Sequence, residues 1–190
     1  HGAAGVTFAA WVNYATLAPA GDNLFISVLG PGDGAALRFG LPGATPGLVA
    51  LGGRSVFSDG FQVVITSGTV AASTWTHLVG VANYQASTMA IYRNGVLDTS
   101  AGVGFSSPTY NNDVGSASDD VLGATFVGTY EFAGALDDIR ILGRALSAPE
   151  VAALYDATKT IHNPTLQWLP HLVAQPSGAL AVKPRRGGAY

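Results

Sequence analysis

Two adjacent carboxylates, Asp137 and Asp138, begin an apolar strand within "FAGALDDIRILGRALSAPEVAALY" (132–155). Strict alternation along this strand puts Asp137 with Ile139 and Ile141 on the core side, and Asp138 on the other side. A buried carboxylate must be hydrogen-bonded, paired with a cation or bound to a metal, because its desolvation is otherwise costly. We expect Asp137 to accept backbone N–H bonds or to pair with an arginine. The alternative is a Ca²⁺ ligand, since that ion prefers oxygen donors.

Two further segments, "AGDN" (20–23) and "YNNDVGSASDD" (110–120), are rich in oxygen donors and can add ligands to such a calcium site. Neither has the spaced acidic pattern of an EF-hand loop. Clusters of Asn, Asp, Ser and Gly most often form ordinary turns. The acidic side chains that these segments offer are Asp22, Asp113, Asp119 and Asp120.

Catalysis by a carboxylate pair requires both groups to flank one bond, as in glycoside hydrolysis. The two adjacent aspartates are expected on opposite faces of their strand. The remaining acid candidates are Glu131 and Glu150, and Glu150 has a structural role in a helix cap. Motifs for a serine nucleophile, a zinc protease or a phosphate loop are absent. We therefore predict that the chain is not an enzyme and that its histidines lack a catalytic partner: His77, His162 and His171.

Aromatic side chains can bind sugars through their flat apolar faces. Trp11 and Trp75 lie in strand-like segments and are expected to fill the core or its edge. Aromatic residues in or beside loops are better placed to contact a ligand, although packing within the loop competes with that role. These candidates are Tyr110, Phe126 and Tyr130.

The composition indicates one ordinary domain without covalent cross-links. Only 11% of the 190 residues are charged, against about 25% in globular proteins. The net charge of −3 argues against nucleic acid as the partner, because phosphate binding requires a basic surface. Cysteine is absent, and no apolar run reaches the roughly 18 residues of a membrane span. The low charge density favours an extracellular or assembled protein.

Short apolar runs between Gly, Pro, Asn and Asp clusters predict an all-β fold, a two-sheet sandwich. Asn94-Gly95 is a strong type I′ hairpin signal. The polar stretch 100–120 carries no strand signal and is expected to be a loop. The predicted strands are "GVTFAAWVNY" (5–14), "NLFISVLG" (23–30), "GLVALG" (47–52), "GFQVVITSG" (60–68), "TWTHLVGVANY" (74–84), "STMAIYRNGVLD" (87–98) and residues 136–141.

One helix is expected after residue 146. Ser147 suits the N-cap, Pro149 the first turn, and Glu150 can complete a capping box. Val151 and Leu154 would then face the sandwich. The helix is therefore predicted to be structural.

Residues 159–190 are predicted to form an extended C-terminal arm beyond a domain of residues 1–158. Prolines at 164, 170, 176 and 184 exclude a long helix there. The arm still carries large apolar side chains, so we expect it to pack on another surface. Its basic end is expected to be solvated, or to contact an acidic neighbour. The proposed partner contacts are Trp168, Leu169, Leu172, Val173, Arg185 and Arg186.

Four segments together resemble the laminin-G-like, concanavalin A-like jelly-roll family. The resemblance implies two antiparallel sheets packed face to face, with glycan recognition and a calcium ion as frequent properties. The acidic cluster of pentraxin-like relatives is replaced here by "GATFVG" (123–128). The matching segments are "FAAWVN" (8–13), "WTHLVGV" (75–81), "IYRNGVL" (91–97) and residues 132–155.

The chain departs from this family at both ends. The family has a strand before "FAAWVN", whereas only "HGAAG" precedes it here. An unfilled strand position leaves an open sheet edge, which upstream residues, the arm or a neighbouring chain should fill. The apolar tail with Arg-Arg resembles the ends of laminin-G-like proteins from tailed phages.

Two functions follow. The first is a non-catalytic structural or adhesion protein of a larger assembly, such as a phage capsid decoration or tail component at the virion surface. It would contact other protein chains, as a homo-oligomer or in a lattice, through the open edge and the arm, and could also bind glycans. The alternative is a calcium-assisted carbohydrate-binding module of a larger secreted protein.

Overall fold

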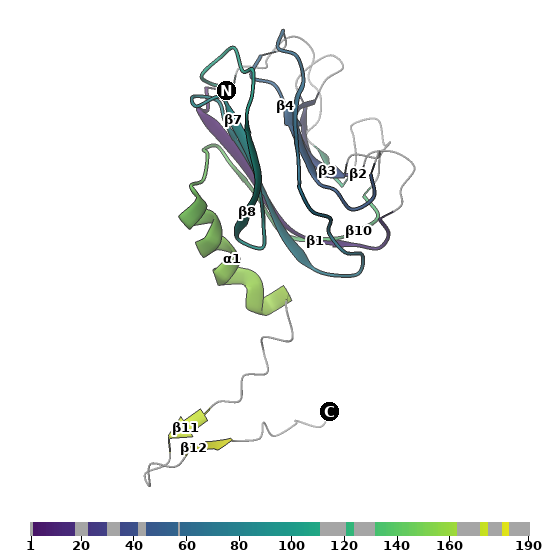
Figure 1. Cartoon of the computed structure of the whole chain (residues 1–190), viewed down its shortest axis with the longest axis vertical. Helices are drawn as coiled ribbons and strands as arrows, with labels where there is room; N and C mark the ends of the chain where they lie inside the picture. The colour runs from purple at the N-terminus through teal and green to yellow at the C-terminus, as the bar shows by residue number, and fades with distance from the viewer. Residues whose placement is uncertain are drawn as a thin grey trace.

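The computed structural model describes residues 2–17, 23–29, 35–41, 45–56, 58–110, 121–123, 132–162, 172–174 and 180–182. These residues form two five-stranded sheets that face each other, with a helix outside one of them (Figure 1). All paired strands are antiparallel, so the predicted all-β sandwich is confirmed. Sheet A has the order β10 (Gly134–Leu142), β1 (Gly5–Tyr14), β6 (Thr76–Asn83), β7 (Thr88–Arg93), β8 (Val96–Gly102). Sheet B has the order β5 (Gln62–Ile65), β4 (Ala50–Gly53), β3 (Ala35–Leu41), β2 (Asn23–Leu29), β9 (Val121–Leu122).

The main core lies between the two sheets and follows the period-2 pattern of the strands. Alternate residues of β1, from Phe8 to Tyr14, point into it and are buried. Phe39 and Leu51 of sheet B meet them from the other side. Gly80 of β6 leaves room there, because an added Cβ would lie 3.0 Å from the Leu51 side chain.

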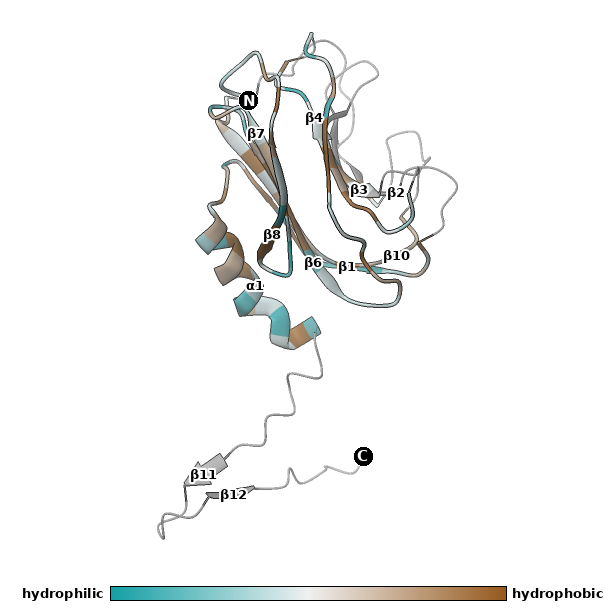
Figure 2. Ribbon diagram, viewed as in Figure 1, coloured by the Kyte–Doolittle hydropathy of each residue, from teal (hydrophilic) through white to brown (hydrophobic). Residues whose placement is uncertain are grey.

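The outer face of sheet A carries a second apolar layer beneath helix α1 (Ala148–His162). Ala9, Val79 and Val81 of the sheet contact Val151 and Leu154 of the helix. In Figure 2 the helix alternates hydrophobic and hydrophilic residues, as expected when one side packs on a sheet and the other meets water. The predicted role of Val151 and Leu154 is confirmed.

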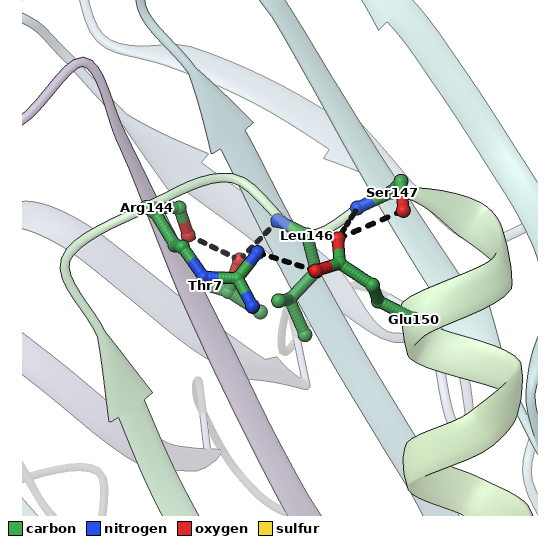
Figure 3. Close-up of polar contacts among 5 residues, drawn as sticks. All are labelled: Thr7, Arg144, Leu146, Ser147 and Glu150. Carbon is green, nitrogen blue, oxygen red and sulfur yellow. Dashed lines mark hydrogen bonds and ion pairs between the residues drawn. The ribbon is translucent and has the colours of Figure 1, made fainter.

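The start of α1 is fixed by hydrogen bonds to its own cap and to β1 (Figure 3). Ser147 donates both its backbone N–H and its hydroxyl to Glu150 Oε2, each at 2.8 Å, so Glu150 reaches back as predicted. Arg144 pairs with the second oxygen of the same carboxylate at 2.7 Å. Thr7, fully buried on β1, donates to the Arg144 carbonyl and accepts the Leu146 N–H. The cap is thereby tied to the sheet.

Gly5 allows the segment before α1 to lie directly on β1. A Cβ at this position would be 2.6 Å from the Ala145 backbone nitrogen and 2.9 Å from the Ala82 carbonyl oxygen. Any side chain at position 5 would therefore push the cap away from the sheet.

Several boundaries differ from the sequence-based expectations. Positive φ at Asn94 and Gly95 confirms the hairpin turn, but β8 continues to Gly102, so residues 100–102 are strand rather than loop. Strand β3 was not predicted, although Leu37, Phe39 and Leu41 alternate with Arg38 and Gly40 as on a strand with one buried face. Residues 159–162 are helical rather than extended, because α1 ends at His162.

Strand β1 is not an edge strand, because β10 and β6 pair with its two sides; in the described part of the chain the edge strands are β10 and β8 in sheet A and β5 and β9 in sheet B, and the open strand position stays a prediction. Beyond α1, the described residues of the arm are β11 (Leu172–Ala174) and β12 (Leu180–Val182), which pair with each other as a two-stranded sheet. Figure 1 draws this pair apart from the two large sheets.

Candidate functional site

The two adjacent aspartates lie at a β-bulge on β10. Ala9 is opposite Arg140 and Trp11 is opposite Asp137, so two residues of β10 face the single residue between them on β1. Asp138 takes a φ of 47°, a left-handed conformation that aspartate tolerates, and its N–H donates to Asp137 Oδ1 at 2.7 Å. The bulge breaks the alternation that the sequence analysis assumed.

The bulge corrects the predicted orientation of Asp137. Directly paired residues of antiparallel strands share a face, and Trp11 lies on the outer face of sheet A, so Asp137 also faces outward. Its side chain is 60% exposed, whereas Leu136 and Ile139 pack against the main core. Ile141, expected in the core, is 49% exposed.

Both aspartates approach His162, the last residue of α1. Its Nε2 lies 3.6 Å from Asp138 Oδ2 and 3.8 Å from Asp137 Oδ2, distances too long for hydrogen bonds. The His162 side chain is only 4% exposed, and Nε2 is buried without a hydrogen-bond partner. The expectation that His162 lacks a nearby carboxylate is therefore wrong. The two elements are distant in sequence, and only the fold brings them together.

His162 belongs to a group of rings between sheet A and α1 that we call the tryptophan cluster: Trp11, Trp75, His77, Tyr155 and His162. The Trp11 and His162 rings stack with centroids 4.5 Å apart, and Trp75 lies 5.0 Å from His162. Trp11 Nε1 donates to Thr158 Oγ1 at 2.8 Å. Trp11 is 2% exposed, so it is buried as expected, but under the helix rather than between the sheets.

His77 lies opposite Trp11 on β6, with ring centroids 5.2 Å apart. Burial, helped by the positive charge of Arg140 and opposed by Asp138, lowers the pKa of His77 to about 4. The imidazole is therefore neutral at pH 7. Its Nδ1 is buried without a hydrogen-bond partner, so the residue is structural but not fully hydrogen-bonded.

The tryptophan cluster has the properties of a packed contact between helix and sheet. The imidazoles of His77 and His162 are buried. A substrate in solution therefore cannot reach His162, the histidine beside the two aspartates that could otherwise act as a base. Among the residues that the structure describes, no group of three or more His, Asp or Glu side chains is arranged to hold a metal ion. The calcium site at Asp137 stays a prediction.

The outer face of sheet B presents a different surface, with large side chains in solvent. Phe61, Val63 and Ile65 alternate along β5 and the residue just before it, and they are 39%, 50% and 43% exposed. Ala50 and Gly52 of β4 pair with Ile65 and Val63, so small residues lie beside the large ones. We call Arg38, Gly52, Arg54, Phe61, Val63 and Ile65 the Phe61 surface.

The Phe61 ring lies on Gly52 between two arginines. A Cβ on Gly52 would come within 2.5 Å of Phe61 Cε1, so only glycine leaves the ring in this place. The guanidinium carbons of Arg38 and Arg54 each lie 5.7 Å from the ring centroid, within the range of cation–π interaction. Arg38 comes from β3, directly opposite Gly52.

The Phe61 surface was not predicted from the sequence. A signal for part of it exists, since Phe61, Val63 and Ile65 alternate and must share one face of a strand. The arginines carry no such signal, because their approach to Phe61 depends on the pairing of β3 with β4.

The remaining predicted site residues are placed as follows. Tyr110 is half-buried, its ring lies 5.7 Å from that of Tyr84, and its backbone bonds to Gly2 and Ala3, so it packs at the core edge. Leu172 and Val173 lie on β11. The others lie outside the described residues: Asp22, Asp113, Asp119, Asp120, Phe126, Tyr130, Glu131, Trp168, Leu169, His171, Arg185 and Arg186.

Within the described part of the chain, no helix is long and apolar enough to cross a membrane.

Comparison with known proteins identifies the fold family. The sequence model described as the concanavalin A-like lectin/glucanases superfamily matches residues 1–152. Among curated proteins, no sequence matches this chain significantly.

Solved structures with the same fold share little sequence with this chain. The carbohydrate-binding module (CBM40) of the Ruminococcus gnavus IT-sialidase, solved with α2,3-sialyllactose, is 17% identical with a TM-score of 0.64, covering 81% of this chain and 83% of that one. A putative carbohydrate binding protein from Bacteroides ovatus is 16% identical with a TM-score of 0.62, covering 80% of this chain but 41% of that one. The SAP-like pentraxin of Limulus polyphemus is 14% identical with a TM-score of 0.57, covering 80% of this chain and 70% of that one.

Proposed function

The chain belongs to the concanavalin A-like lectin/glucanase superfamily, and from this premise we propose that it is a non-catalytic domain that binds a glycan on the Phe61 surface. The observation that carries the proposal is an exposed aromatic ring, Phe61, on a sheet face that α1 does not cover. Sugar rings have apolar faces that stack on aromatic rings, and their hydroxyls accept hydrogen bonds from arginine. A glycan ligand also favours an extracellular or surface location.

The absence of catalysis is part of the proposal. Glu150 is engaged in the helix cap, and Asp137 and Asp138 surround a buried imidazole. A glycosidase instead needs two carboxylates with room for a sugar between them. The solved relatives named as carbohydrate-binding support a binding role at the level of the fold.

Binding to an array of immobilised glycans tests this function. We expect the intact chain to retain at least one glycan class, and Phe61→Ala to lose about twofold to tenfold in affinity, since stacking on an aromatic ring contributes about 0.5–1.5 kcal/mol. Ile161→Ala is the matched control, because Ile161 is 66% exposed but lies on α1. Unchanged affinity in Phe61→Ala, or no binding to any glycan, would contradict the proposal.

The same array with and without EDTA tests the calcium-assisted form of this function. If Asp137 holds Ca²⁺, the ion should raise the melting temperature, and Asp137→Ala should abolish the rise. Equal melting curves with Ca²⁺ and with EDTA would rule out a calcium site in this chain.

Assembly into a larger particle, such as a phage capsid or tail, is the second candidate, favoured by the apolar tail sequence around Trp168. Because α1 extends to His162, truncation after residue 163 removes the tail and keeps the helix. Sedimentation should show a higher-order species for the intact chain and a monomer for the truncated one. A monomeric intact chain would count against assembly.

A further inference from the structure

The arginines of the Phe61 surface give the proposed ligand a chemical class. Arg38 and Arg54 both approach the Phe61 ring, although the chain as a whole carries a net charge of −3. Two cations around one exposed ring produce a local positive potential that an anion would complement. We propose that the glycan bound here is acidic, carrying a carboxylate or a sulfate. This inference rests on the proposed function.

Of the two arginines, Arg38 is the better placed to bind an anion. Its guanidinium is held by the Phe61 ring, and its half-buried side chain leaves Nε inaccessible and without a hydrogen-bond partner. Among the described residues, no carboxylate forms an ion pair with it. A guanidinium is planar and presents its N–H groups in its own plane, where they can bond both oxygens of a carboxylate or sulfate.

On the β4 and β5 side of Arg38, the described neighbours neither compete for its charge nor block access to it. Gly52, directly opposite on β4, has no side chain, and Val63 beyond it is apolar. Asp59, the acid in the loop between β4 and β5, already accepts hydrogen bonds from Ser55 and Ser106, which lower the pKa of its carboxyl against the opposing effect of burial. Asp59 is therefore occupied in fixing its own loop.

The Arg38 guanidinium is also pre-organised by Phe61 and Gly52. Phe61 can hold the guanidinium only where Gly52 leaves room for the ring, since a Cβ there would overlap Cε1 and Cζ. An arginine restrained by a cation–π contact loses less side-chain entropy when it binds than a free one does. The arrangement of glycine, ring and arginine across three strands is therefore suited to recognise a fixed anion on a sugar ring.

The experiment compares binding of the intact chain to three hexasaccharides by calorimetry: a neutral glucan, an oligogalacturonate and a heparin fragment. We expect one of the two acidic ligands to bind at least about tenfold more tightly than the glucan, because a charge-assisted bidentate pair contributes about 1.5–3 kcal/mol. Heparin carries both carboxylates and sulfates, so binding of the oligogalacturonate would show that a carboxylate suffices, and binding of the heparin fragment alone would indicate that sulfate is required. Raising the salt concentration should weaken the acidic ligand selectively.

Variants at Arg38 test whether this residue carries the preference. Arg38→Gln should reduce acidic binding to about the level of the glucan, and Arg38→Lys should restore only part of it, because lysine cannot bond two oxygens in one plane. Melting curves of both variants establish that they fold, and Ile161→Ala should bind as the parent chain does. Tighter glucan binding, or Arg38→Gln without effect, would overturn the acidic class but leave glycan binding intact. No binding to any array glycan or to these hexasaccharides would overturn both.

Discussion

The outer faces of the two sheets differ in what covers them. On sheet A, α1 buries Trp11, and the rings of His77 and His162 close around it. On sheet B, Phe61 and its neighbours on β5 remain between 39% and 50% exposed. The same strand architecture thus yields one face that stabilises the fold and one that is available to a ligand.

The difference shows that aromatic and charged residue types alone do not locate a site. In the sequence, the tryptophans and the adjacent aspartates of sheet A are the most evident candidates for a functional site. In the structure they lie around the C-terminal end of α1. The residues of the Phe61 surface match no functional motif in the sequence. Because Phe61, Val63 and Ile65 are exposed, this surface is the better candidate for a binding site. Substitutions on the two faces should therefore separate stability from binding.

The largest effect is expected from Trp11→Ala. Removing a buried tryptophan from beneath α1 leaves a cavity and should lower the free energy of unfolding by about 3–5 kcal/mol. Urea denaturation followed by circular dichroism measures the change. A loss below about 1 kcal/mol would mean that the packing of α1 on sheet A contributes little to stability. The outer faces of sheets A and B would then not differ in their contribution to the fold.

The next largest effect concerns pH and the buried His77. Its pKa is about 4 in the folded chain and about 6.5 when unfolded, so the unfolded state binds the proton first as the pH falls. The contribution of a neutral His77 is complete above pH 6.5 and is lost progressively down to about pH 4, at a cost of about 3 kcal/mol. Urea melts across this range should show the loss, and His77→Gln should reduce it. If the parent chain and His77→Gln lost stability in parallel as the pH falls, His77 would not be the group responsible for the loss.

A smaller effect is expected from Thr158→Val, which keeps the shape of the side chain but removes the acceptor for Trp11 Nε1. A buried donor left without a partner costs about 2 kcal/mol. Thr158→Ser retains the hydroxyl and serves as the control in the same denaturation experiment. Equal stability of the valine and serine variants would show that the hydrogen bond is unimportant.

The smallest effect on stability is expected on sheet B. Because Phe61 is 39% exposed, Phe61→Ala should change the free energy of unfolding by less than about 1 kcal/mol, although it should weaken glycan binding. Denaturation of this variant beside Trp11→Ala gives the comparison directly. A destabilisation as large as that of Trp11→Ala would identify Phe61 as part of a core instead of a binding surface.

Local patterns determined much of the fold in advance. The alternation in residues 5–14, the Asn94-Gly95 turn and the Glu150 capping box each depend on neighbours in sequence, and each is present in the structure. Strand β3 carries the same alternation, since Leu37, Phe39 and Leu41 alternate with Arg38 and Gly40, but it was not predicted, because the segment is short and its glycine-rich flanks indicate turns. The end of α1 was placed too early, because the sequence gives no clear stop signal before Pro164.

The sequence by itself determined the two-sheet sandwich, its hairpin and its capped helix, because period-2 alternation, positive-φ turns and capping are short-range properties. Only the tertiary structure decided where the chemistry lies. A bulge at Asp138 turned Asp137 toward solvent, and α1 brought His162 to both acids. The pairing of β3, β4 and β5 gathered Arg38, Gly52 and Phe61 from separate strands, and contacts between residues far apart in the chain leave no periodic trace in it.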